Sequence, residues 1–581
     1  MVASNSGEHF FMKDKYSDLF QVWEELYPEQ PSDMLKVFTA EIDRFMTAKT
    51  LPPLEKEWYK DAVVYSLYVD LFNKDFVGLT ARLDYLQSLG VNCLWLLPIL
   101  ESPMRDAGFD ISDYRRIRKE LAGLGENATD DQMRKLFGNF LKEAHSRGLR
   151  VIFDIATNHI SEHHAWFKEA RKSKDSPFRN FFIWSKDGKE YADARIIFYG
   201  IEESNWKKEG DEYYFHRFFD FQPDLNYRNP QVLIEMSRNL LFWMERGVDG
   251  FRADAIPYIW KEEGTACENL PKTHAIVRFF RTVIDLVRPN TLLLAEACQK
   301  PHEVVKYFGN GDECNAGYHF PLMPQIFKSV AMANRTPVVE TLSLAVTPEI
   351  PAGAQWFTFL RCHDELSLEL VYVTEEDRKY IHEHYCRKPE WDFRLGQGIS
   401  ARLAELMERD PARIGLIYSI MLSLPGTPVI YYGDEFGKFN DEAYYQEMKT
   451  TVGKDDTRFL VRGKIDWNSV KSALARPGSF ESLVFIQVKT MLHARNAYPV
   501  FGRGKLSWVD LQKPDGRQAG EIMAYYRRFD NIDILVVQNL SADEISLKWD
   551  ISFRKSLLGK VPEIGNGRIK LQGFEYFWLL V

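Results

Sequence analysis

The sequence predicts an α/β fold built on a (β/α)₈ barrel, in which eight parallel strands alternate with helices. Three observations support this prediction. Between Trp58 and about residue 435, short apolar runs alternate with longer stretches of helical periodicity. Runs that are apolar throughout are typical of parallel strands buried on both faces. About eight such units in roughly 400 residues match the size of this barrel, whose active sites lie at the carboxyl ends of the strands.

Eight short runs are the predicted strands of the barrel. The helical stretches between them include residues 79–90, 130–148 and 229–247, and several end at a glycine, as helices commonly do. In chain order, the predicted strands are residues 62–69, 91–98, 149–156, 248–255, 291–298, 316–322, 356–364 and 427–435, of which 316–322 has the weakest pattern.

Segments before, within and after the barrel break the alternation. Residues 1–57 have apolar positions at steps of three and four, which predicts a helical extension. The barrel is then expected over 58–159 and 226–494, because the intervening 160–225 is too long for an ordinary loop and predicts an inserted subdomain. Over 495–581, short alternating runs predict an antiparallel β-sandwich.

Composition excludes several classes of function. The chain has a formal net charge of -9 and no basic stripe, so nucleic acid is not expected as a partner. No apolar run is long enough to cross a bilayer, and the first residues do not resemble a secretory signal. The six cysteines lack C-x-x-C spacing, as expected for free thiols in a reducing compartment. We therefore expect a cytoplasmic protein that binds neither membrane nor nucleic acid.

Charged side chains close four of the predicted strands. In VDGFRADA, Arg252 and Asp254 are two residues apart, so both point to the same side of the strand. A single pair of this kind is more often structural than functional. Four such strands are much stronger evidence, because the carboxyl ends of barrel strands share one face. The side chains expected on that face are Asp254, Glu296 and Asp364, with Arg252, His159 and His363 beside them.

Three carboxylates beside two histidines and an arginine suit the cleavage of an acetal. Retaining glycoside hydrolysis needs one carboxylate as nucleophile and one carboxylic acid as proton donor, roughly 5 Å apart. Neighbouring negative charge raises the pKa of the donor and keeps it protonated near neutrality. A metal site is the competing interpretation, but no H-x-x-x-H or other short paired spacing supports it. We therefore expect an acid–base site without a metal.

Four motifs at these strand ends resemble the signature segments of the α-amylase superfamily of glycoside hydrolases. They are DIATNH, GFRADA, LLAEA and FLRCHDE. The resemblance implies that Asp254 is the nucleophile, Glu296 the general acid and base, and Asp364 a carboxylate that binds sugar hydroxyls and distorts the ring. The same resemblance places three more side chains around the bound glucosyl unit, namely His159, His363 and Arg252.

Within this superfamily the chain is most similar to the trehalose synthase group, in stretches such as DECNAGYHFPLMPQIF and SLPGTPVIYYGDE. That resemblance implies an intramolecular transglucosylase, which interconverts maltose and trehalose through a covalent glucosyl intermediate kept from water. It also implies that Asp106 and Arg462 form a pair that closes the pocket around one glucosyl unit. Phe109 is expected to stack on a sugar face. The partner is then a disaccharide α-glucoside.

Other segments differ from that group. The helical extension, the short segment LFNKDFVGL after the first strand and the loop KTTVGKDDTRFLVRGKIDW are similar to amylosucrases and sucrose hydrolases. FQPDLNY resembles the corresponding segment of oligo-1,6-glucosidases, which act on short α-glucosides. An amylosucrase-like or α-glucosidase-type enzyme that acts on sucrose or short α-glucosides is therefore the alternative. A catalytically silent barrel that only binds is a third hypothesis, which the three retained carboxylates argue against.

No cofactor is expected, because the calcium sites of the family are predicted to be lost. The short segment after the first strand lacks the Asp and Asn residues of one site. At the other, the ligands would be Asn158, Asp224 and the backbone near Tyr258 and Ile259, but Lys261 stands where the family has Glu. We hypothesise that its ammonium group replaces the cation, the alternative being a solvated surface lysine. Members of the group are often dimers or larger, so the resemblance leaves a homo-oligomer open.

Overall fold

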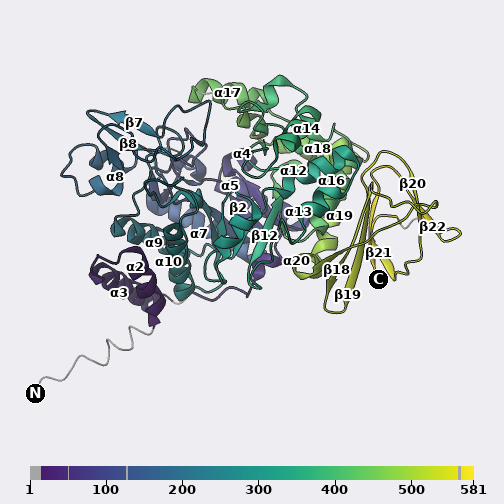
Figure 1. Ribbon diagram of the computed structural model, residues 1–581, viewed down its shortest axis with the longest axis horizontal. Coiled ribbons are helices and arrows are strands. Elements are labelled where there is room, and N and C mark those ends of the chain that lie inside the picture. Colours follow the sequence, from purple (N-terminus) through teal and green to yellow (C-terminus); the bar gives the residue numbers. More distant parts are fainter. Residues whose placement is uncertain (1–14, 50, 126–127, 454, 561–563) are drawn as a thin grey trace, which may run out of the picture.

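The eight-stranded barrel predicted from the sequence is present and closed (Figure 1). The computed structural model describes residues 15–49, 51–125, 128–453, 455–560 and 564–581. The parallel strands surround the barrel in the order β1-β16-β12-β11-β10-β9-β5-β2, which confirms all eight predicted runs. Their bounds are Val64–Leu67 (β1), Cys93–Leu96 (β2), Arg150–Ala156 (β5), Gly250–Asp254 (β9), Leu292–Ala295 (β10), Ala316–Tyr318 (β11), Gln355–Phe359 (β12) and Thr427–Tyr431 (β16).

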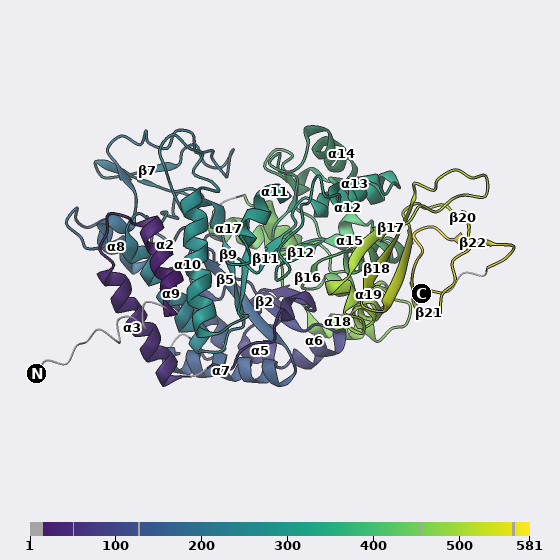
Figure 2. The same ribbon diagram turned by 60° about the horizontal axis from the view of Figure 1, so that its bottom comes forward.

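Helices join consecutive barrel strands and cover the outside of the barrel (Figure 2). In α9, the Asn229 side chain accepts a hydrogen bond from the N–H of Gln231, and Pro230 occupies the first turn, so the start of the helix is fixed by sequence. The principal covering helices are α6 (Leu83–Leu89), α7 (Asp130–Ser146), α9 (Pro230–Glu245), α10 (Pro271–Val287), α12 (Leu322–Met332), α13 (Thr336–Thr341), α16 (Pro411–Ser423) and α19 (Phe480–Asn496). Among the described residues, no helix combines the length and the apolar character that a membrane span needs.

The register of the central strands brings the predicted site residues to one mouth of the barrel. Arg252 on β9 is level with Asp154 on β5 and with Leu294 on β10. Asp254 ends β9, and Glu296 directly follows β10. Because the strands are parallel, these side chains lie at the same end of the barrel.

Two insertions follow the carboxyl ends of barrel strands. The first insertion, residues 160–225, contains α8 (Ala165–Ala170) and a three-stranded sheet, and it confirms the predicted inserted subdomain. The second insertion, residues 366–399, contains α14 (Glu375–Tyr385) and another three-stranded sheet. The strands of the first sheet are β6 (Trp184–Ser185), β7 (Trp206–Glu209) and β8 (Glu212–Phe215), and those of the second are β13 (Leu366–Ser367), β14 (Asp392–Phe393) and β15 (Gly398–Ile399).

The helical extension was predicted over residues 1–57, of which 1–14 and 50 lie outside the described residues. Its described part contains α2 (Ser17–Leu26) and α3 (Asp33–Ala48), which pack on the covering helices α10 and α9 (Figure 2). Phe38 of α3 is fully buried and stacks on Phe279 of α10 with ring centroids 6.4 Å apart. The Tyr27 hydroxyl donates a hydrogen bond of 2.8 Å to the carbonyl of Tyr227. The extension is therefore an integral layer on one side of the barrel.

The C-terminal region is antiparallel, as predicted. A five-stranded sheet in the order β17-β18-β19-β23-β21 and a two-stranded sheet of β20 and β22 share one apolar core. The β structure begins only at Lys505, because α19 continues to Asn496. The boundary at 495 and the other domain boundaries stay predictions. The strands are β17 (Lys505–Trp508), β18 (Ile522–Phe529), β19 (Ile532–Asn539), β20 (Ile545–Lys548), β21 (Lys555–Leu558), β22 (Arg568–Leu571) and β23 (Tyr576–Leu580).

Candidate active site

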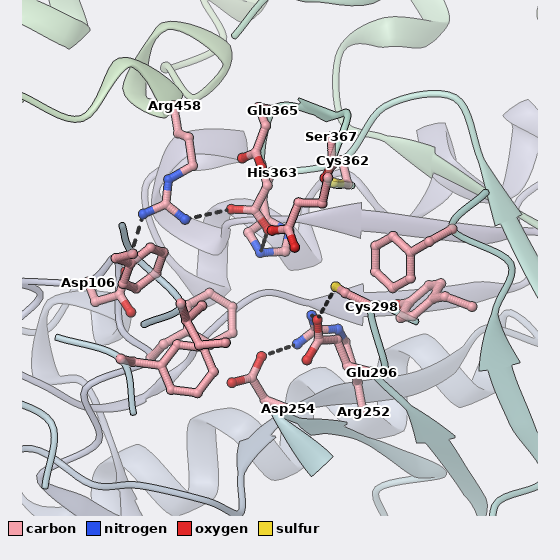
Figure 3. Close-up of a pocket in the computed structure, with 18 of the residues that line it drawn as sticks. Asp106, Arg252, Asp254, Glu296, Cys298, Cys362, His363, Glu365, Ser367 and Arg458 are labelled. Carbon is pink, nitrogen blue, oxygen red and sulfur yellow. Dashed lines mark hydrogen bonds and ion pairs between the residues drawn. The ribbon is translucent and has the colours of Figure 1, made fainter. Parts of the chain in front are cut away.

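One pocket at the carboxyl mouth of the barrel gathers most of the predicted site residues (Figure 3). Two aromatic side chains of the first insertion, Phe198 and Phe218, and two residues of the second, Phe393 and Arg394, complete its wall. Arg462 lies behind the wall, where it reaches Asp364. The predicted residues that line the pocket are Asp106, Phe109, His159, Arg252, Asp254, Glu296, His363 and Asp364.

The Arg252 guanidinium connects the two predicted catalytic carboxylates. Its Nη1 lies 2.7 Å from Oδ1 of Asp254, and its Nη2 lies 3.9 Å from Oε1 of Glu296. Nη1 also donates a 2.6 Å hydrogen bond to Asp154, which accepts a second bond from the indole N–H of Trp95. Asp154 thus positions Arg252, a role that sequence reasoning missed although the residue opens the DIATNH motif. Asp254 and Glu296 consequently face the same cavity.

Glu296 lies in surroundings that favour its protonated form. Burial raises the pKa of this carboxyl, Arg252 opposes the rise, and the negative charge of Asp254 adds to it. The backbone N–H of Ala255 donates to Oε2 at 2.8 Å, and the Cys298 thiol donates to Oε1 at 3.1 Å. A carboxyl with a raised pKa beside an ionised neighbour can donate a proton near neutrality.

Asp364 lies in the opposite electrostatic surroundings. Nε2 of His363 is 3.0 Å from Oδ2, while Arg458 Nη1 and Arg462 Nη2 are 3.1 and 3.2 Å from Oδ1. Burial alone would raise the pKa of Asp364, but these three neighbours outweigh it and hold the pKa well below its usual range. The anionic form of Asp364 is therefore favoured, and it can accept hydrogen bonds from sugar hydroxyls.

Asp106 pairs with an arginine that the sequence analysis did not single out. Nη2 of Arg458, rather than the expected Arg462, lies within ion-pairing distance of Asp106 Oδ1, at 3.7 Å. The side-chain amide of Gln222 donates to Oδ2 at 2.9 Å. Burial raises the pKa of Asp106 to about 6, although Arg458 opposes the rise. Arg458 and Arg462 are four residues apart around the short helix η8 (Thr457–Val461), so both reach the same wall.

Phe109, His159 and His363 form an aromatic part of the wall. The Phe109 ring stacks on His363 with centroids 5.4 Å apart. Burial lowers the pKa of both histidines, so neutral imidazoles are favoured. Nε2 of His159 is buried and has no protein partner among the described residues. A buried polar atom of this kind in a pocket wall is available for a ligand.

The Lys261 side chain occupies the position of the family's second calcium site. The Lys261 ammonium lies 2.6 Å from Oδ1 of Asn158 and 2.7 Å from Oδ2 of Asp224, and 3.5 Å from the carbonyl of Ile259. Lys261 is only 3% exposed, so it is not a solvated surface lysine. Burial lowers the pKa of the ammonium, while the Asp224 charge opposes that change. The donor set does not fit calcium, because a cationic group already occupies its centre.

Arg394 links the two insertions beside the pocket. Its guanidinium lies 3.3 Å from Oε1 of Glu369, donates a 3.1 Å hydrogen bond to the side chain of Gln397, and also bonds to the carbonyl of Ile197 in the first insertion. Sequence reasoning did not find Arg394, because residues 197 and 394 meet only in the folded chain. The length of the second insertion was the available signal.

Comparisons with known proteins agree with this geometry. The family model for the α-amylase catalytic domain matches residues 72–475. The trehalose synthase/amylase TreS of Mycolicibacterium smegmatis is 47% identical over 406 residues, which span 68% of this chain and 66% of that protein, just under two thirds of its length. The trehalose synthase/amylase TreS of Mycobacterium tuberculosis is 39% identical over 577 residues, or 90% of each protein.

Solved structures support the fold. A trehalulose synthase mutant in complex with Tris has a TM-score of 0.68 at 23% identity, and the match covers 90% of this chain and 99% of that chain. Two findings establish the family: the family model matches residues 72–475, and the similarity to the Mycobacterium tuberculosis protein covers 90% of the chain. The chain belongs to the α-amylase family of glycoside hydrolases, and over 90% of its length it is similar to a trehalose synthase/amylase.

Proposed function

We propose that this protein is a retaining transglucosylase that interconverts maltose and trehalose within one pocket. The observation that carries the proposal is the Arg252 guanidinium, which contacts Asp254 and approaches Glu296 from one side. This arrangement keeps an anionic nucleophile beside a protonatable carboxyl, as double displacement requires.

Two displacements account for the reaction. Asp254 attacks the anomeric carbon of the glucosyl unit while Glu296 gives its proton to the glycosidic oxygen, so that the C–O bond breaks and glucose is released. The glucosyl unit is then bound to Asp254 as an ester. The released glucose presents another hydroxyl, Glu296 takes its proton, and the new C–O bond replaces the ester. Attack by the anomeric hydroxyl gives trehalose, and attack by the 4-hydroxyl gives maltose. Two inversions retain the α configuration.

The wall near Asp364 suits the glucosyl unit that is transferred. Asp364 offers an anionic acceptor to sugar hydroxyls, His159 offers a buried ring nitrogen, and Phe109 offers an apolar ring face. Asp106 and Arg458 bound this side of the pocket in place of the expected Asp106–Arg462 pair. We assign this wall to the donor glucose.

The opposite wall suits the glucose that stays in the pocket between the two steps. It contains Phe320 and Cys298, and Arg394 ties the second insertion to the first beside it. Isomerisation succeeds only if the ester meets the retained glucose before it meets water. A polar link between the two insertions favours that outcome, because it restricts the opening through which glucose leaves and water enters.

Product analysis tests the proposal. The protein is incubated separately with maltose, trehalose and sucrose, and the sugars formed are resolved. Trehalose from maltose, maltose from trehalose and little free glucose are expected. Glucose alone from maltose would favour an α-glucosidase, and fructose from sucrose would favour the amylosucrase-like alternative. No change in any of the three sugars would contradict an enzymatic role for the pocket.

The place of action and the assembly state belong to the same proposal. None of the six cysteines, all of which lie in the described part of the chain, forms a disulfide. Free thiols are usual in a reducing compartment, and we propose that the enzyme acts in the cytoplasm.

A homo-oligomer remains a prediction, which light scattering of the purified protein checks.

A further inference from the structure

Three metal-binding side chains lie together outside the active site, on the second insertion. His382 and Cys386 are four residues apart, at the end of α14 and at its C-cap, so they lie on one face of the helix. Asp392 begins β14 and faces them. The ligand atoms of the three residues lie within 4.8 Å of one another, and all three are partly exposed. We propose that this His382–Cys386–Asp392 cluster binds a divalent transition-metal ion, of which zinc is the best match.

The donor set selects the class of metal. One imidazole, one thiolate and one carboxylate suit zinc, whereas calcium and magnesium prefer oxygen ligands only. Three protein ligands leave a fourth tetrahedral position for water, which the partial exposure of the cluster supplies. Tetrahedral zinc holds its ligand atoms about 3.5 Å apart. Ligand atoms up to 4.8 Å apart would approach by at most about 1.3 Å, and the 2.8 Å contact between His382 and Asp392 would open by about 0.7 Å, both within reach of side-chain rotation.

The contacts made without metal are local. Nε2 of His382 is 2.8 Å from Oδ1 of Asp392, and the Cys386 thiol donates to the carbonyl of Lys388 at 3.5 Å. A metal ion would replace both contacts by ligand bonds to the imidazole, thiolate and carboxylate, with release of the thiol proton to solvent. No oxidation or reduction is involved, because zinc does not change its oxidation state.

The cluster is joined to the active-site pocket by the residues that follow it. Oδ1 of Asp392 also accepts a 2.8 Å hydrogen bond from the N–H of Gly396. That bond closes a turn in which Arg394, Leu395 and Gly396 all have positive φ, at 53°, 54° and 87°. Phe393 and Arg394 line the pocket. A metal on Asp392 would therefore bind the same carboxylate that closes the turn presenting Arg394.

Metal titration with matched variants tests the proposal. The full chain is stripped with a chelator, dialysed, and titrated with zinc by calorimetry and with cobalt by absorption spectroscopy. We expect one tight ion per chain and a thiolate-to-cobalt charge-transfer band. His382→Ala and Cys386→Ser are each expected to weaken binding by at least about 100-fold, since even outer-shell changes cost up to that much. His384→Ala is the matched control, because His384 is exposed on the same helix and outside the cluster.

Two results would overturn the proposal. One is a wild-type chain that binds no ion, or that still binds one ion equally well after His382→Ala and Cys386→Ser. The other is a charge-transfer band that survives Cys386→Ser and disappears in Cys362→Ser, because Cys362, His363 and Asp364 form a second group of close ligand atoms inside the pocket. Unfolding midpoints of the variants show that any loss of binding is not a loss of fold. Metal binding does not depend on the sugar specificity, so this test and the product analysis fail independently.

Discussion

Arg252 carries one positive charge among three carboxylates, Asp154, Asp254 and Glu296. One guanidinium cannot balance three buried anions, so a proton is expected on at least one of them at neutral pH. Burial and the Asp254 charge raise the pKa of Asp154 to about 7, although Arg252 opposes the rise, and the pKa of Glu296 is raised as well. A proton among these carboxyls is thus favoured before substrate binds, and on Glu296 it serves glycosidic cleavage.

Replacement of the nucleophile is the first test at this scale. Asp254→Ala is expected to reduce turnover of maltose by on the order of 10⁴-fold or more, because no ester can form. The unfolding midpoint should stay close to that of the wild type. Added azide should partly restore turnover and give a glucosyl azide of inverted configuration. Full activity in the variant, or rescue with retained configuration, would show that another residue is the nucleophile.

The Cys298 thiol gives a second test, because it donates a hydrogen bond to Glu296 Oε1. A donor stabilises the carboxylate over the acid, so its loss in Cys298→Ala should raise the pKa of Glu296 further. The alkaline limb of kcat/KM should then move to higher pH, since Glu296 must be protonated for the first step. Cys298→Ser supplies a stronger donor and should move the limb the opposite way. A change of 0.5–1 kcal/mol corresponds to roughly half a pH unit. Identical pH profiles for both variants would exclude this coupling.

Lys261 gives a third test at the scale of single residues. Metal analysis of the purified protein should find no stoichiometric calcium, because the ammonium lies among the oxygen atoms of Asn158, Asp224 and Ile259. Lys261→Glu restores a carboxylate and should make the unfolding midpoint rise with added calcium. Lys300→Glu, a change of the same charge at an exposed position, serves as control. Calcium bound to the wild-type chain at this position would contradict the assignment.

At the scale of elements, the second insertion supplies Phe393 and Arg394 to the pocket wall, and we propose that it restricts access. Arg394→Ala removes the hydrogen bond that ties this insertion to the carbonyl of Ile197, worth about 1.5–3 kcal/mol for a charged donor. The ratio of free glucose to trehalose formed from maltose should rise by on the order of tenfold, because water enters more readily. Arg517→Ala, whose side chain is 76% exposed on the C-terminal region, should leave the ratio unchanged. An unchanged ratio of glucose to trehalose in Arg394→Ala would mean that the hydrogen bond between Arg394 and Ile197 does not keep water out of the pocket.

The elements also show what sequence can predict. The barrel strands were found because burial on both faces makes them apolar throughout. Strand β11 has only three residues, which explains its weak pattern. The sequence analysis paired Asp106 with Arg462, whereas the structure pairs it with Arg458. A motif fixes the position of an arginine in the chain, but it does not show which of two nearby arginines reaches a given carboxylate. The Arg394–Ile197 contact has no local signature, because it joins two insertions far apart in sequence.

At the scale of the whole molecule, the N-terminal helices act as part of the barrel's outer layer. Phe38→Ala removes a fully buried ring between α3 and α10 and is expected to cost about 3–5 kcal/mol at that interface. Thermal unfolding should begin at a lower temperature, and proteolysis should first release the N-terminal helices. Met34→Ala, at a position that is 37% exposed, is the control. Equal stability of the two variants would mean that the extension is not coupled to the barrel.

The ammonium of Lys261 has a consequence for how the molecule matures. The Lys261 ammonium joins Asn158, just after β5, to Asp224 in the first insertion. Because this cation is part of the polypeptide, every chain carries one, and no metal ion has to be supplied. The newly made chain therefore forms this ionic contact as soon as these segments meet. Citrate and phosphate, which bind calcium, cannot remove a cation that is covalently part of the chain.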